Sequence, residues 1–138
     1  MTEESGIGLI KIHDYACKGE DFRDFLIQLR SKVGKRPVSL FMDNATIHKK
    51  PCVKEQWSKL NMEPIWNIGY SPEFNPIEAV FSKVKRLFNS QRLNNLVNKT
   101  GLNADKEIKG AFKQISVEHC CSCVRKSLYL LRRASEQD

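Results

Sequence analysis

Two carboxylates, Asp43 and Glu78, stand at positions where side chains can do metal-dependent chemistry. Asp43 directly follows the apolar run VSLFM at residues 38–42, and open α/β sheets place their binding sites at such strand ends. Glu78 falls in the first turn of an expected helix, after the loop GYSPEFNP at residues 69–76. Carboxylate oxygens suit Mg2+ or Mn2+, and a pair of such ions can activate the attacking oxygen and stabilise the leaving oxygen in phosphoryl transfer.

Each carboxylate also has a purely structural interpretation. Asp43 and Asn44 can form a turn, because both side-chain types bond to nearby backbone groups. Glu78 stands three residues after Asn75, which is the spacing of a capping box at a helix start. Residue type and spacing alone favour these structural interpretations over catalytic ones.

The hydrophobic pattern predicts the elements that would position the two acids. Strands are expected at residues 6–12, 38–42 and 63–68, and the second of them reads as a central strand buried on both faces. Helices are expected over residues 22–33, from Pro51 to about Asn61, from Pro76 to about Phe88, and more loosely over 104–134 after a polar linker. This alternation predicts an α/β fold with parallel strand pairing.

The charge distribution changes sharply at Glu78. The chain has a formal net charge of +7. Residues 60–78 contain three glutamates and no Lys or Arg, whereas residues 79–100 contain five basic residues and no acid. A polyanionic partner beside local acidic chemistry would produce this pattern, and so would a solvated basic helix face. Charge alone does not decide between them.

Cysteine usage indicates a reducing compartment. The five cysteines are Cys17, Cys52, Cys120, Cys121 and Cys123, and this spacing is a poor disulfide framework. His119 beside Cys120 suggests zinc, but no second ligand pair exists, so helix packing is the favoured interpretation. No apolar stretch approaches the length of a membrane span, and the polar N-terminus is no secretory signal. We therefore expect no membrane partner, and a nuclear location in a eukaryote or a cytoplasmic one otherwise.

Two strings of the sequence together resemble the Tc1/mariner superfamily of transposases. VSLFMDNATIH contains the pattern Asp-Asn-Ala-x-x-His, from Asp43 to His48. YSPEFNPIE then gives Tyr-Ser-Pro-x-x-Asn-Pro-Ile-Glu, ending at Glu78, and Phe81 stands where Trp is common. The gap of 34 residues between the two acids is similar to the branch whose last acid is glutamate. The similarity covers about residues 6–92.

The resemblance implies a DDE catalytic domain with a ribonuclease H-like fold, which cleaves and transfers DNA strands with bound metal ions. Asp43 would be the second acid and Glu78 the third, and both would bind Mg2+ or Mn2+. Supporting roles are implied for Asn44, His48 and Asn75, and DNA contacts for Lys83, Lys85, Arg86 and Arg92. Residues 1–92 would form the DDE domain, and residues 93–138 its C-terminal helical extension.

The sequence departs from the family pattern upstream of Asp43. Segment 6–12 matches the third strand of the family fold, so we expect about three strands to be retained and the first two, with the first catalytic Asp, to be missing. Such a partial, N-terminally truncated domain would be incomplete as a catalyst alone. Its exposed strand edge would pair in a homo-oligomer or with a complementing strand of another chain. The alternative is a non-catalytic module that binds DNA or a partner and derives from a transposase.

Overall fold

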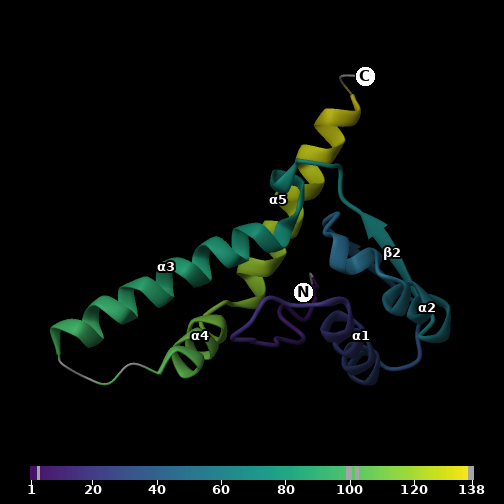
Figure 1. Ribbon diagram of the computed structural model, residues 1–138. Helices are drawn as coiled ribbons and strands as arrows, with labels where there is room; N and C mark the ends of the chain where they lie inside the picture. The colour runs from purple at the N-terminus through teal and green to yellow at the C-terminus, as the bar shows by residue number, and fades with distance from the viewer. Residues whose placement is uncertain (3, 99–100, 102, 137–138) are drawn as a thin grey trace. The chain divides into compact units, whose positions relative to one another are not determined.

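The computed structural model describes residues 1–136 apart from residues 3, 99, 100 and 102. In chain order the elements are α1 Gly19–Val33, β1 Val38–Met42, the 3-10 turn η1 Thr46–Lys49, α2 Pro51–Lys59, β2 Met62–Trp66, the 3-10 turn η2 Pro72–Phe74, α3 Pro76–Val97, α4 Ala104–Lys113 and α5 Val117–Ser135 (Figure 1). The chain forms two compact units. The sheet unit is Gly8–Asn75, and the helical unit combines Met1–Ile7 with Pro76–Asp138.

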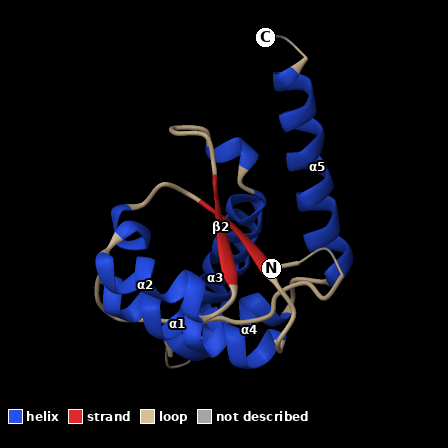
Figure 2. Cartoon of the chain, turned by 90° about the vertical axis from the view of Figure 1, so that its right-hand side faces the viewer, coloured by secondary structure: helices blue, strands red, loops and turns tan. Residues whose placement is uncertain are grey.

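In the sheet unit, β1 and β2 run parallel, paired from Val38↔Met62 to Met42↔Trp66 (Figure 2). Helices α1 and α2 pack against the two strands around a shared core. This core consists of Leu26 from α1, Val53 and Trp57 from α2, and Met42 and Met62 from the strands. Leu26 and Val53 are fully buried, and burial of each such side chain contributes about 1.5–3 kcal/mol. This core fixes the carboxyl ends of the strands, where the sequence predicts a site.

The helix boundaries of the sheet unit follow the residues expected to set them. Gly34 adopts a φ of 76° and its N–H donates to the Arg30 carbonyl, so α1 ends at Val33, where the sequence predicts the end of this helix. Pro51 is the first residue of α2, where its missing N–H costs nothing. Asn61, with a φ of 50°, turns the chain from α2 into β2.

The expected strand at residues 6–12 is wrong: among the described residues, only β1 and β2 form a sheet. The segment is divided between the two units at Ile7, which packs against the helical core. Gly6 has a φ of 67° and pairs with Thr2 in an isolated bridge, while the Gly8 carbonyl accepts a hydrogen bond from Lys32 Nζ at 2.9 Å. An apolar run becomes a strand only where a partner strand is available to it.

The expectation that β1 is buried on both faces is also wrong. Of its five residues only Met42 is buried, and Ser39 is exposed. Val38 and Leu40 pack on the core of the sheet unit, so one face of β1 is covered by this unit. A continuous apolar run is therefore a weak guide to how many layers cover a strand.

In the helical unit, α3 packs against α4 and α5. Val80 and Val84 of α3 meet Ala111 of α4 and Cys120 and Cys123 of α5 in one core. The expected loose helical region is two helices, which begin after Asn103 and Ser116; each of these accepts a hydrogen bond from the N–H three residues on. The division of domains expected after residue 92 falls within α3 and stays a prediction about the family domain.

Two of the three cysteines of α5, Cys120 and Cys123, pack as side chains of this core. Cys120 is fully buried and Cys123 is 8% exposed, and all five cysteines of the chain are free thiols. This confirms the interpretation of Cys120 and Cys123 as helix packing. None of the described helices has the length and apolar character needed to span a bilayer.

The mixed α/β fold class is confirmed. Two parallel strands and five helices in the described parts of the chain are consistent with a partial ribonuclease H-like fold followed by helices. In the described residues the sheet has two strands, rather than the expected three or so.

Candidate functional site

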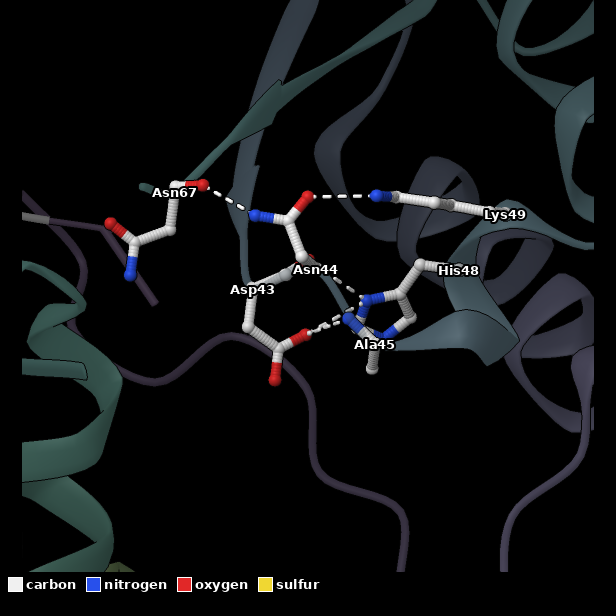
Figure 3. Close-up of polar contacts among 6 residues, drawn as sticks. All are labelled: Asp43, Asn44, Ala45, His48, Lys49 and Asn67. Atoms are coloured by element: carbon white, nitrogen blue, oxygen red, sulfur yellow. Dashed lines mark hydrogen bonds and ion pairs between the residues drawn. The ribbon is translucent and has the colours of Figure 1, made fainter. Parts of the chain in front are cut away.

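Asp43 lies directly after β1, at the carboxyl end of the parallel pair, and its side chain is 52% exposed. Its Oδ1 atom accepts a hydrogen bond from the Ala45 N–H at 3.2 Å and lies 3.1 Å from His48 Nδ1 (Figure 3). The carboxylate is thus oriented by contacts to one oxygen. Among the described residues no hydrogen bond or ion pair joins Oδ2, so that oxygen is available to a ligand.

His48 is held from two sides in the turn η1. Its ring centroid lies 4.3 Å from that of Phe22 on α1, and its side chain is 14% exposed. Nδ1 also lies 3.4 Å from the Asp43 backbone oxygen. When Nδ1 carries the proton, it donates to Asp43 and limits rotation of the carboxylate.

Asn44 connects the ends of the two strands. Its Nδ2 donates to the Asn67 carbonyl, just past β2, and its Oδ1 accepts from Lys49 Nζ at 2.8 Å (Figure 3). The Asn67 N–H donates to the Met42 carbonyl at 2.7 Å, which extends the ladder by one bond. These bonds fix the backbone on which Asp43 stands, and the supporting role expected of Asn44 stays a prediction.

Glu78 and Asn75 lie on either side of the boundary between the units. Asn75 is the last residue of the sheet unit, is 6% exposed, and donates its N–H to the Pro72 carbonyl at 2.9 Å. Glu78 is exposed in the first turn of α3, as the sequence predicts. Because Asp43 and Glu78 belong to different units, the approach of their carboxylates stays a prediction. No three His, Cys, Asp or Glu side chains gather as a metal site in the described residues.

The basic residues of α3 fall on two sides of the helix. Residues seven apart are nearly two turns apart, so Lys85 and Arg92 share a face with Glu78. Lys83 and Arg86 lie toward His119 of α5: loss of hydration lowers the pKa of His119, and the two positive charges lower it further. Lys85, Arg86 and Arg92 are exposed, and Lys83 is half-buried. The basic residues of α3 therefore form two pairs on different sides of the helix, Lys85 with Arg92 and Lys83 with Arg86.

Sequence reasoning missed three participants in the strand-end cluster: Lys49, Phe22 and Asn67. Asn67 is the first residue after β2, as Asp43 is the first residue after β1, but the strand expected at residues 63–68 includes Asn67, so the strand-end rule does not single it out. Phe22 lies in the helix expected over residues 22–33, and its contact with His48 depends on tertiary packing that spacing does not encode.

A family model described as DDE superfamily endonuclease matches residues 1–98. The chain belongs to this superfamily. The match includes Asp43, Glu78 and all four basic residues of α3, and it ends beside the last residue of α3, Val97. Membership of this superfamily supports a transposase-like nuclease ancestry for the chain. Endonucleases of this superfamily generally use divalent metals. No curated protein matched the chain.

Proposed function

We propose that this DDE superfamily protein is a Tc1/mariner-type transposase domain of the glutamate branch, whose chemistry is metal-dependent cleavage and transfer of DNA strands. The observation that carries the proposal is the strand-end position of Asp43, with one carboxylate oxygen held by Ala45 and His48 and the other available. The motif pair ending at Glu78, at a spacing of 34 residues, supports the subtype.

Asp43 and Glu78 would hold Mg2+ or Mn2+ as the second and third acids of the family site. The donor set fits, because both are exposed carboxylates and hard oxygen ligands suit these ions. When bound, such ions supply a nucleophile at neutral pH and stabilise the charge on the leaving oxygen.

The supporting residues act through Asp43 and through the start of α3. His48 restrains the Asp43 carboxylate, and Asn44 fixes the backbone beneath it. Asn75 precedes α3 directly, and its own N–H is held by Pro72, so it sets where the helix bearing Glu78 begins. Loss of a side chain that holds a metal ligand in place typically lowers metal affinity by about 10- to 100-fold.

DNA is the proposed partner, bound through its phosphates. Lys85 and Arg92 lie on the face of α3 that carries Glu78, and Lys83 and Arg86 lie on the side toward His119. Such contacts release counterions and carry no sequence preference, so we expect a Kd of about 10⁻⁴ to 10⁻⁶ M at physiological salt. The protein would meet DNA in the nucleus, or in the cytoplasm of a cell without one.

The open edge of the sheet is a second proposed contact. Among the described residues β1 pairs with β2 alone, so its other edge has unpaired N–H and C=O groups. A strand from a second copy or from a complementing chain would satisfy them, and would complete the sheet around Asp43.

Two assays distinguish a metal-binding transposase domain from a DNA-binding module without chemistry. Manganese titration should show binding that Asp43→Asn weakens, because removal of the charge removes a ligand. Supercoiled plasmid with Mg2+ should show no robust cleavage by the 138 residues alone, since two carboxylates position the ions less well than three. Equal manganese binding by wild type and Asp43→Asn would favour the module, and cleavage abolished by Asp43→Ala would show a complete catalyst.

A further inference from the structure

Tyr70 combines two unusual features in the loop after β2. Its side chain has a relative exposure of 107%, the highest of the large apolar and aromatic residues that the structure describes. Its backbone has a φ of 57°, a left-handed conformation that is uncommon for a bulky residue. The ring therefore gains nothing from packing, while the backbone beneath it is strained. Such strain persists only where surrounding contacts impose it, and it is concentrated at functional sites.

The contacts that impose this conformation come from Asn67. Its Nδ2 donates to the Ser71 carbonyl at 2.8 Å and its Oδ1 accepts from the Ile68 N–H at 2.9 Å. Its own N–H is bonded to Met42 in β1, so the loop that carries Tyr70 is tied to the strand that carries Asp43. The loop thus holds Tyr70 outward at the carboxyl end of the sheet.

Other apolar surface and a cation lie at the same strand end. Trp66, the last residue of β2, is 37% exposed, and Ile68 is 55% exposed. Lys49 Nζ lies 5.2 Å from the centroid of the Trp66 ring and also bonds to Asn44, next to Asp43. Exposed aromatic rings interleaved with basic groups are the combination that binds unpaired nucleotides, because rings stack on bases and cations meet phosphates.

We propose that Tyr70 is a stacking site for an unpaired nucleobase of the DNA strand at Asp43, with Trp66 exposed at the same strand end. The inference rests on the proposed function, since it takes DNA as the partner. Proteins that act at one position of a strand often take a base out of the helical stack, and aromatic side chains then receive it. Any base can stack, so the site contributes affinity for single-stranded or splayed DNA without strong sequence preference.

The test uses a single-stranded oligonucleotide containing 2-aminopurine, whose fluorescence falls on stacking, and the variants Tyr70→Gly and Tyr70→Phe. Glycine accepts the left-handed backbone and removes only the ring, so Tyr70→Gly should unfold at the same temperature as wild type or higher. Wild type and Tyr70→Phe should quench the probe. Tyr70→Gly should lose the quenching and bind the oligonucleotide about tenfold more weakly, with an unchanged salt dependence. Tyr129→Ala, at another exposed tyrosine, is the matched control and should quench like wild type.

The outcomes separate this inference from the proposed function. Salt-dependent DNA binding by wild type without quenching, or equal quenching by Tyr70→Gly, would overturn the stacking site and leave DNA as the partner. A lower melting temperature for Tyr70→Gly would show that the ring stabilises the fold and would also overturn it. Absence of salt-dependent binding by wild type would remove DNA as the partner, and the stacking site with it.

Discussion

The sheet unit and the helical unit contribute to the proposed site in different ways. At the end of β1, polar side chains hold one another: Asn44 bonds to Asn67 and Lys49, and His48 contacts Asp43 and Phe22. On α3 the charged side chains stand exposed along the helix, except Lys83, which is half-buried. The first arrangement fixes the direction of a carboxylate, and the second provides a positive field. Precise orientation requires neighbouring side chains from several elements, whereas attraction of a polyanion requires only charge on one helix.

The largest expected effect tests whether the two units are separately stable. Leu26→Ala, in the core of the sheet unit, should destabilise that unit by about 2–5 kcal/mol, because it leaves a cavity. Both tryptophans, Trp57 and Trp66, belong to the sheet unit, so tryptophan fluorescence during urea unfolding reports this unit.

Val80→Ala in the helical core is the matched control. It should move the circular dichroism transition of the helices and leave the fluorescence transition in place. If both variants shift both transitions equally, the two units unfold as one, and the expectation that they are separately stable is contradicted.

The two basic pairs of α3 should contribute unequally to DNA binding. The double variant Lys85→Ala/Arg92→Ala removes the pair on the face of Glu78 and should lower the slope of log K against log salt by up to about two units. Lys83→Ala/Arg86→Ala removes the same charge from the side near His119 and should lower it less. Fluorescence anisotropy with duplex DNA over a salt series measures both. A larger loss from the second pair would place the DNA on the other side of α3.

The third prediction concerns the positioning of Asp43. His48→Ala should weaken manganese binding about tenfold, because the carboxylate loses the contact that orients it. His48→Asn, with a side chain that can donate to Asp43, should restore part of the affinity. Titration of both variants by electron paramagnetic resonance gives the values. Unchanged manganese affinity in His48→Ala would show that His48 packs against Phe22 and does not position Asp43.

The smallest expected effect is an acid-dependent one at the start of α1. The Lys18 N–H lowers the pKa of Asp21, and the Tyr15 hydroxyl lowers it further. A carboxyl whose folded pKa is depressed stabilises the fold above its unfolded value, near 3.8, and that contribution is lost as the pH falls through the folded value. Asp21→Asn should therefore flatten the pH dependence of the fluorescence transition below about pH 5. An unaltered pH profile would contradict this.

The elements around the site were predictable where a local residue decides them. Gly34, Pro51 and Pro76 set helix boundaries through their own backbone chemistry, and the apolar run before Asp43 forms β1. The strand expected at residues 6–12 failed because an apolar pattern does not specify a partner strand. The contacts around His48 and Tyr70 were missed for a related reason. The ring that packs on His48 is Phe22 of α1, which is distant in sequence. Asn67 lies close to Tyr70 in sequence, but its bond to Met42 depends on the pairing of β2 with β1.

Asp43 and Glu78 are proposed to bind the same metal ion or ion pair. The direct test is a double-mutant cycle in manganese affinity, measured for wild type, Asp43→Asn, Glu78→Gln and the double variant. If the carboxylates share a site, each single variant weakens binding, and the double variant binds little more weakly than the weaker single variant, because either loss disrupts the shared site. Additive losses, or binding unaffected by Glu78→Gln, would show that the two acids act apart and would contradict the account.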